Sequence, residues 1–549
     1  MENTESPFES DRIEAARSFA QTLIVVDDEA GNQTQEHAIN DLEPLKEPKR
    51  ADSNQEEGGG DQIRTSSRAS NPLDQKSLID SALKAGLVCA VVRPNKGEDM
   101  AEQVAIAAER ADIVSLDWQM GDKGDKAIKI INEIIKSDSL KGGRLRLIAI
   151  YTGDRNFDEI LKKVEDSIPQ CRRDEYKFSK ADNRIESKNG LRIVWLLKSG
   201  GTQLSENLKN YQVGESDLAE RLLVEFSKLS KGLLSNVALA TIGALRDSTH
   251  HTLGKFTDRM DGPYFHHRAL LSSPIDAQDY AVSIVLSDLK SAVDRGPVGD
   301  KFAGANAISN RINSLPIDND NFKLKSLNGT ETDLAKEKAE KIITSGYDSV
   351  KETVGITKKD AKKKFTSIFF DSLQDGCDAM LEFASLTGVR RHPNGKVCLP
   401  EPCLVQGTVI HSEGTGFLLC LQAPCDTVRV DKGTSFFFIP LEKCTDSEPD
   451  HVVPTSENPN SFLKLNFARN AYTNARSLKF PVSDPNNGRV VGAKKEAGGS
   501  DYFFKDTEGN EYRWVADLKS RRASRAAQQI SRQISRIGFD EFEPFRKGT

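Results

Sequence analysis

Short apolar segments that end in polar side chains recur in the first 200 residues of the chain. Each segment is rich in isoleucine, leucine and valine. Continuous apolar runs of this length are typical of strands that are buried on both faces of a parallel sheet. The pattern therefore predicts an α/β domain whose strands include residues 23–26, 113–116, 144–150 and 191–197.

The polar residues that follow these segments have complementary chemistry. The first segment ends at Asp27 and Asp28, the second at Asp117, the third at Thr152 and the fourth at Lys198. The carboxyl ends of parallel strands meet at one edge of a sheet, where open α/β sheets bind ligands. Clustered carboxylates repel one another unless a cation lies among them, and Mg²⁺ prefers oxygen ligands. We therefore expect a magnesium site at this edge.

This order of acid pair, acid, hydroxyl and amine resembles the receiver domain of two-component response regulators. The resemblance implies that Asp27, Asp28 and Asp117 hold Mg²⁺ and that Asp117 accepts a phosphoryl group from a histidine kinase. It also implies that Thr152 and Lys198 contact the phosphoryl oxygens. A carboxylate can attack phosphorus when cations neutralise the transferring oxygens. An unrelated doubly wound domain with acids at its strand ends is the alternative.

Two further positions fit the resemblance, and two depart from it. Trp195 lies three residues before Lys198, where the family usually has a rotating aromatic residue. Gln119 lies two residues after the acceptor, and we expect it to tune hydrolysis of the phosphoryl group. Gly121 and Ser199 stand where the family usually has proline, so the cis peptide bond usual after the lysine is in doubt.

The pattern of the remaining chain predicts a multidomain protein. An α/β doubly wound, flavodoxin-like receiver is followed by an all-helical region, and then by a small mainly-β barrel or sandwich with a C-terminal helix. Within the receiver, a polar segment at about 31–75 is expected to be disordered because it can bury little apolar surface. The predicted parts are a leader at 1–20, the receiver at 21–213, the helical domain at 214–390, the β-rich domain at 391–515 and the C-terminal helix and tail at 516–549.

The helical region contains a candidate catalytic pair. Arg246 and His251 resemble the R-x4-H motif of HEPN ribonucleases, in which the histidine is the acid/base and the arginine stabilises phosphate charge. A phosphorylation-gated ribonuclease is therefore an alternative function. A structural hydrogen-bonding cluster is the competing interpretation, because such pairs are common on helices.

The β-rich region and the last helix each leave two interpretations open. Five cysteines fall in the β-rich region, namely Cys398, Cys403, Cys420, Cys425 and Cys444. The two pairs with four intervening residues, Cys398 with Cys403 and Cys420 with Cys425, could bind zinc, although buried inert thiols are favoured. The last helix carries several arginines opposite an apolar stripe. The arginines could contact nucleic acid or an acidic partner, whereas a solvated face is favoured.

The net charge and several motifs along the chain limit the classes of function that the protein could have. The net charge of −6 argues against a general nucleic-acid binder, and no apolar run is long enough to span a membrane, so we expect a cytoplasmic protein. Diffuse motifs resemble large receiver proteins of bacterial conflict loci, including anti-phage defence, which implies a regulator or phosphoryl sink. The implied partner is a histidine kinase. Further candidate partners are another response regulator, an effector protein and a second copy of the chain. The motifs span 226–234, 246–256, 424–426 and 536–541.

Overall fold

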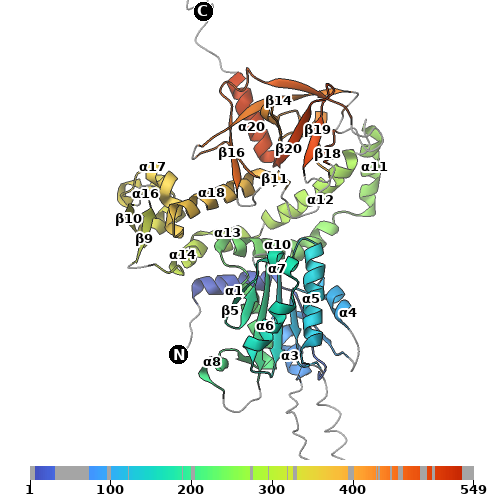
Figure 1. Cartoon of the computed structure of the whole chain (residues 1–549), viewed down its shortest axis with the longest axis vertical. Helices are drawn as coiled ribbons and strands as arrows, with labels where there is room; N and C mark the ends of the chain where they lie inside the picture. Colours follow the sequence, from blue (N-terminus) through green and yellow to red (C-terminus); the bar gives the residue numbers. More distant parts are fainter. Residues whose placement is uncertain are drawn as a thin grey trace, which may run out of the picture. The chain divides into compact units, whose positions relative to one another are not determined.

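The chain forms two compact units in a computed structural model (Figure 1). The N-terminal unit comprises Met1–His250 with Leu289–Leu315, and the C-terminal unit comprises His251–Asp288 with Pro316–Thr549. The structure describes residues 6–534 except 31–72, 95–99, 121–122, 188–189, 200–203, 272–275, 295, 318–319, 326–329, 394–400, 428–429, 431–432, 446–447, 456–460, 483–490 and 497–500.

The N-terminal unit is built on a mainly parallel sheet with the strand order β2-β1-β3-β4-β7-β6-β5. The first five strands of this order are parallel, and the β5–β6 hairpin adds two antiparallel strands beyond β7. A short strand, β8, also pairs with β7. The strands are β1 Thr22–Val26, β2 Val88–Val92, β3 Ile113–Leu116, β4 Arg146–Thr152, β5 Ser179–Ala181, β6 Arg184–Glu186, β7 Leu191–Lys198 and β8 Gln212–Val213.

Helices cover both faces of this sheet, as the predicted doubly wound fold requires. Strand residues alternate between two cores, since successive side chains point to opposite faces. One core contains residues of α4 Ala101–Ala108, α5 Asp125–Leu140, α6 Phe157–Ser167 and α7 Gln170–Tyr176. The other contains residues of α1 Pro7–Phe19, α3 Gln75–Lys84, α9 Glu215–Ser227, α10 Leu233–Leu253 and α13 Val298–Ala303.

Two of these helices lie outside the predicted receiver limits of 21–213. In the predicted leader, α1 begins with a capping box between Ser6 and Glu9 and buries Phe19 in the core beneath the sheet. Just beyond residue 213, α9 buries the apolar stripe of Leu218, Leu222 and Phe226 in the same core. The remaining helices of the unit are α8 Glu206–Lys209 and α14 Ala305–Asn313.

The predicted insertion at about 31–75 falls largely outside the described residues. Its last residues are described, and Asp74 caps α3 by accepting hydrogen bonds from the backbone N–H groups of Lys76 and Ser77 at 3.1 Å. The amphipathic pattern after the insertion predicts a helix over 77–83, and the observed helix α3 begins two residues earlier, at Gln75.

The region predicted to be all-helical also contains a hairpin, so that expectation was wrong in this detail. Strands β9 Asn321–Lys325 and β10 Glu331–Ala335 pair antiparallel, and their alternating burial of Phe322, Leu324 and Leu334 has the period of a strand. Helix α12 begins in the C-terminal unit and runs on past the limit of that unit at Asp288. The helices of the C-terminal unit that precede its large sheet are η1 Asp258–Met260, α11 Asp261–Leu270, α12 Asp276–Asp294, α15 Lys336–Ser345, α16 Tyr347–Val354, α17 Lys358–Lys364, η3 Phe365–Phe369 and α18 Leu373–Gly388.

The C-terminal strands form one continuous antiparallel sheet with the order β15-β16-β14-β13-β12-β20-β19-β18. Strand β11 also pairs with β20, and β17 pairs with β14. Helix α20 Ser520–Ile534 packs its apolar stripe on one face. The strands are β11 Val389–Arg391, β12 Thr408–Ser412, β13 Gly416–Cys420, β14 Thr434–Lys443, β15 His451–Pro454, β16 Phe462–Phe467, β17 Arg476–Phe480, β18 Lys494–Lys495, β19 Tyr502–Lys505 and β20 Glu511–Leu518.

Two local predictions in this sheet need correction. The predicted last helix does not begin at Ala516, because Ala516 lies within β20 and the helix starts at Ser520. The period-two pattern also predicts a short strand at 427–430, whereas residues Pro424–Thr427 form a short helix, α19. Among the described residues, no helix is long and apolar enough to cross a membrane.

Candidate functional site

Three carboxylates meet at the carboxyl edge of the parallel sheet. Strands β1 and β3 are adjacent, and the backbone N–H of Asp117 donates to the carbonyl of Val26 at 2.8 Å, which fixes the two strand ends together. One oxygen from each of Asp27, Asp28 and Asp117 can be chosen so that all lie within 4.8 Å of one another. The structure therefore brings together the acids that the sequence placed at separate strand ends.

Lys198 reaches the same cluster from the end of β7. Its Nζ lies 2.7 Å from Oδ2 of Asp27 and 3.5 Å from Oδ2 of Asp117. The ammonium group also lies 5.7 Å from the ring centre of Tyr151 on the intervening strand β4. Lys198, Asp27 and Asp117 are all buried, so their charges interact with little screening by water.

Burial sets the protonation behaviour of this cluster. Removal from water raises the pKa of Asp117 to about 6, an effect that Lys198 opposes and Asp27 reinforces. The pKa of Asp28 is raised by burial and by the neighbouring charge of Asp27. Burial alone would lower the pKa of Lys198, but attraction to Asp117 and Asp27 outweighs it and raises this pKa. The cluster thus holds crowded negative charge that a further cation would relieve.

Thr152 and Trp195 lie on the strands beside the cluster. Thr152 ends β4, is fully buried, and accepts a hydrogen bond from the backbone N–H of Asp154 at 3.2 Å. Trp195 is also fully buried on β7 and lies among aromatic rings, with centroids 5.3 Å from Phe157 and 6.0 Å from Tyr211. Both residues are therefore part of the packed domain in this conformation. The described peptide bonds include no cis bond at Ser199 or elsewhere.

The segment after Asp117 depends on a glycine that the sequence analysis did not identify. Gln119 is exposed, and its backbone hydrogen bond helps to lower the pKa of Asp117. Trp118 is buried, and its ring lies against Gly124, which has a φ of +98° at the start of α5. A Cβ atom at Gly124 would lie 2.2 Å from the Trp118 ring. Both the backbone conformation and the close approach therefore require glycine.

Replacing Gly124 with alanine is expected to destabilise the N-terminal unit by about 1–3 kcal/mol, because the new methyl group overpacks against Trp118 and the left-handed conformation is strained. The free energy of unfolding, measured in urea, checks this. Gly153→Ala is the matched control, since Gly153 also lies beside the site, but a Cβ atom there would meet no other atom within 4 Å. Equal stability of the two variants would contradict the prediction.

The alternative catalytic pair is not assembled as a site. The guanidinium of Arg246 lies 3.3 Å from both carboxylate oxygens of the buried Asp112, contacts the backbone oxygen of Phe19 and stacks 4.3 Å from its ring. His251 is exposed on the same helix, and residues five apart on a helix are separated by about 140° around its axis. Arg246 thus joins α10 to Phe19 of α1 and to Asp112 beside β3, and the ribonuclease hypothesis gains no support from this geometry.

The acid cluster is the only group of three metal-ligating side chains that meets in the described part of the chain. Of the cysteines considered for zinc, Cys420 is fully buried and desolvation raises its pKa to about 12, which is typical of an inert core thiol. Cys398 and the side chain of Cys425 lie outside the described residues.

Comparison with known families agrees with the position of this site. Residues 19–203 match the sequence model of the response receiver domain. This segment contains the acid pair, the third acid, the hydroxyl and the lysine. Comparisons with curated proteins and with solved structures gave no match. The segment is therefore similar to a response receiver domain.

Proposed function

We propose that this chain is a response-regulator protein in which Asp117 accepts a phosphoryl group from a histidine kinase. The observation that carries the proposal is the meeting of Asp27, Asp28 and Asp117 within 4.8 Å, with Lys198 paired to two of them. This arrangement supplies a nucleophile and fixed positive charge at one edge of the sheet.

The residues of the site would divide the work of phosphoryl transfer. A carboxylate oxygen of Asp117 forms a bond to phosphorus as the bond from phosphorus to the donor imidazole breaks. Lys198 neutralises charge on the transferring oxygens, and Asp27 holds its ammonium group at 2.7 Å. Because the ammonium is fixed before the reaction, little reorganisation is needed in the transition state.

The acid cluster also fits a divalent cation. Asp27, Asp28 and Asp117 offer carboxylate oxygens, the ligand type that Mg²⁺ prefers, and the raised pKa of Asp28 reflects burial and repulsion that a cation would relieve. These three residues would hold Mg²⁺, which when bound would supply further neutralisation of the phosphoryl oxygens.

Thr152 and Trp195 are the proposed readout of phosphorylation. The Thr152 hydroxyl is held by the backbone of Asp154 in the loop after β4. A phosphoryl dianion on Asp117 would attract this hydroxyl and move the loop with it. Trp195 packs on Phe157 at the start of the helix that follows this loop, so a shift there would change the packing around the indole.

Replacing Lys198 with methionine is expected to slow phosphoryl uptake from acetyl phosphate about 100-fold or more, because a preorganised charge at the reacting oxygens is lost. The initial rate of adduct formation, followed by intact-protein mass spectrometry, measures this. Lys209→Met is the control, since Lys209 is exposed on α8 and pairs only with Glu206 in the described structure. A rate unchanged in Lys198→Met would argue against a receiver mechanism.

Replacing Gln119 with alanine is expected to change the rate of phosphoryl loss by at least about threefold, equal to ~0.7 kcal/mol. Gln119 is exposed two residues beyond the acceptor. In receiver folds this position flanks the path of water to the phosphoaspartate. The half-life of the phosphorylated protein after removal of the donor gives the rate. An unchanged half-life would refute this role, whereas uptake itself should be preserved.

The biological setting that we propose rests on the sequence motifs outside the receiver domain. They favour a regulator or phosphoryl sink in a bacterial defence locus, with a histidine kinase and a second response regulator as partners. A sink competes for the kinase, so adding this chain should drain phosphoryl groups from the second regulator. The Asp117→Ala variant should leave that regulator phosphorylated, and equal draining by both proteins would contradict the proposal.

A further inference from the structure

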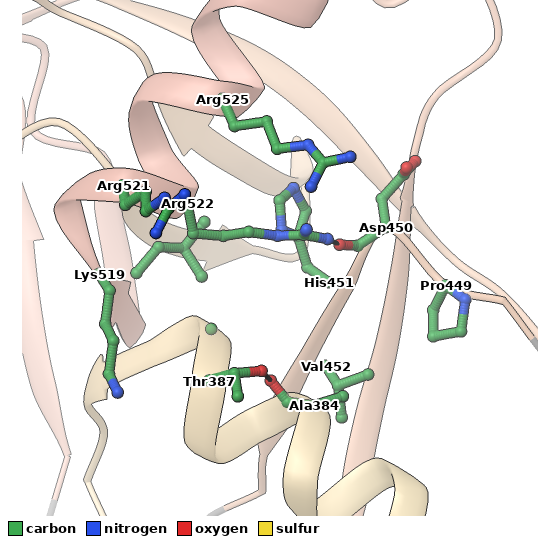
Figure 2. Close-up of a pocket in the computed structure, with 12 residues that line it drawn as sticks. Ala384, Thr387, Pro449, Asp450, His451, Val452, Lys519, Arg521, Arg522 and Arg525 are labelled. Atoms are coloured by element: carbon green, nitrogen blue, oxygen red, sulfur yellow. Dashed lines mark hydrogen bonds between the residues drawn. The ribbon is translucent and has the colours of Figure 1, made fainter. Parts of the chain in front are cut away.

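A basic pocket lies in the C-terminal unit and is lined by residues of that unit alone. It has a volume of about 350 Å³. Its walls come from the last turn of α18, the start of β15 and the first turns of α20 (Figure 2). Pockets of this size are typical sites for small molecules.

His451 is a buried polar group without a partner at this pocket. Its residue is only 4% exposed, and neither ring nitrogen has a hydrogen-bond partner among the described residues. The ring is held edge-on to Phe467, with centroids 5.4 Å apart. A buried imidazole without hydrogen bonds is costly, so a ligand that accepts from its N–H would stabilise this arrangement.

Positive charge dominates the pocket. Its lining carries the cationic side chains of Lys519, Arg521, Arg522 and Arg525 against the carboxylate of Asp450. Asp450 is engaged elsewhere, because its Oδ2 accepts from the backbone N–H of Phe467 at 3.0 Å. The first turns of α20 add the positive end of a helix dipole. The pocket therefore has an unbalanced positive potential.

The cations differ in how far they are already engaged. Lys519 Nζ donates to the carbonyl of Leu386 at 2.7 Å, at the end of α18. Arg522 donates to the backbone oxygen of Asp450. Arg521 and Arg525 form no ion pair within the described residues. In Figure 2, the imidazole of His451 and the guanidinium groups of Arg522 and Arg525 lie close together.

Burial and like charge both disfavour the charged forms of Arg522 and His451. Burial lowers the pKa of Arg522, and the nearby charge of Arg525 lowers it further. Burial and the charge of Arg522 lower the pKa of His451 to about 4. A bound anion would reverse these effects, since it favours the charged form of each group.

We propose that this pocket binds the phosphate group of a small phosphorylated molecule, with His451, Arg522 and Arg525 contacting the phosphate oxygens. Guanidinium groups match phosphate because their N–H donors form paired, charge-assisted hydrogen bonds. Two guanidiniums and an imidazole suit a dianion better than a single carboxylate. The small side chains of Ala384 and Val452 line the pocket beside these groups and would receive the uncharged part of the ligand.

Isothermal titration calorimetry of the full-length protein with inorganic phosphate and with AMP tests the proposal. The solutions contain no divalent cation, so that the acid cluster of the receiver domain attracts no phosphate. Saturable binding at one site is expected. Arg525→Ala and His451→Phe should each weaken it at least about tenfold, because each removes a charge-assisted or buried hydrogen bond.

Arg532→Ala is the matched control, because Arg532 lies on the same helix, carries the same charge and does not line this pocket. Its effect should be less than about twofold, since separated surface charges are screened. Arg525 is exposed, so its variant tests the site even if His451→Phe destabilises the sheet. Tighter binding of AMP than of phosphate would identify a nucleotide-type ligand, and equal binding would identify free phosphate.

Two results would overturn the proposal. One is the absence of saturable binding of both phosphate and AMP. The other is equal weakening by Arg525→Ala and Arg532→Ala without any effect of His451→Phe. This second result, together with tighter binding of an RNA oligonucleotide, would instead indicate a polyanion surface along α20, where Arg521, Arg525 and Arg532 line a second pocket.

Discussion

Replacing Asp117 with alanine or asparagine is expected to abolish the phosphoryl adduct that forms when the protein is incubated with acetyl phosphate and Mg²⁺. Asp117 is the proposed nucleophile, and its Oδ2 lies 3.5 Å from Nζ of Lys198 within the acid cluster, so the variants lack the carboxylate oxygen that would bond to phosphorus. Intact-protein mass spectrometry counts the adducts directly. An adduct of unchanged amount on both variants would refute the assignment of the acceptor.

The asparagine variant also separates chemistry from folding. The pKa of Asp117 is raised from 3.8 to about 6, so its charged form is disfavoured in the folded state without a metal. This pKa difference corresponds to roughly 3 kcal/mol at pH 7. Asp117→Asn should therefore be more stable than the native protein at pH 7 in the absence of Mg²⁺, although it accepts no phosphoryl group.

The stability difference between the native protein and Asp117→Asn should depend on pH. For a group whose folded pKa is raised, its stabilisation is fully present below the unfolded pKa and is lost as pH rises through the folded pKa. The native protein should thus lose stability relative to Asp117→Asn between about pH 4 and pH 6. Urea unfolding at several pH values measures the difference, and parallel curves over this range would contradict the expectation.

The meeting of the acid cluster and Lys198 could be predicted because parallel strands have a strong sequence pattern. Segments buried on both faces read as continuous apolar runs, and the first polar residue after each run marks the sheet edge. Lys198 and Asp27 are each the first polar residue after an apolar run, so both are expected at the same sheet edge. They do pair there, although they are 171 positions apart in the sequence. The match of residues 19–203 to the response receiver domain agrees with this inference.

Elements with weaker patterns were harder to predict. Strands β9 and β10 are rich in charged and polar residues, and their cross-strand pair of Lys323 and Asp333 is only apparent once the register is known. The packing of α9 on the sheet was missed because its apolar stripe fits a helical bundle equally well. Whether a helix belongs to one domain or the next depends on the surface against which its apolar stripe packs. The local sequence of the helix does not contain this information.

The basic pocket could not be predicted for a related reason. The sequence shows His451 within a short apolar strand and Arg522 and Arg525 in a helix about 70 residues later. Only the antiparallel sheet brings these segments together. The arginines were expected to be solvated, and their relation to a buried histidine depends on tertiary structure alone.

Replacing Asp138 with alanine is expected to destabilise the N-terminal unit by about 3–5 kcal/mol, because it leaves the buried charge of Arg146 without its counterion. Arg146 is fully buried at the start of β4, and its Nε and Nη2 donate to the two oxygens of Asp138 at 2.7 and 2.8 Å. Its Nη1 donates to the carbonyls of Ala108 and Ala111 at 2.6 and 2.8 Å.

Urea unfolding of the full-length protein, followed through the transition of the N-terminal unit, measures this loss. Asp158→Ala is the control, since Asp158 is exposed and its pairing with Lys180 at 3.5 Å should contribute no more than about 1 kcal/mol. Equal stability of the two variants would show that the buried pair is not essential.

A double variant, Asp138→Leu with Arg146→Met, distinguishes the two roles of the arginine. Removal of both charges eliminates the unpaired cation, which for a simple buried pair often restores stability. Here the carbonyls of Ala108 and Ala111 would lose their donor, and each buried carbonyl left without a donor costs about 1–3 kcal/mol. We therefore expect only partial recovery. Because these carbonyls lie in the segment that leads into β3, the same arginine also helps to position the strand that ends at Asp117.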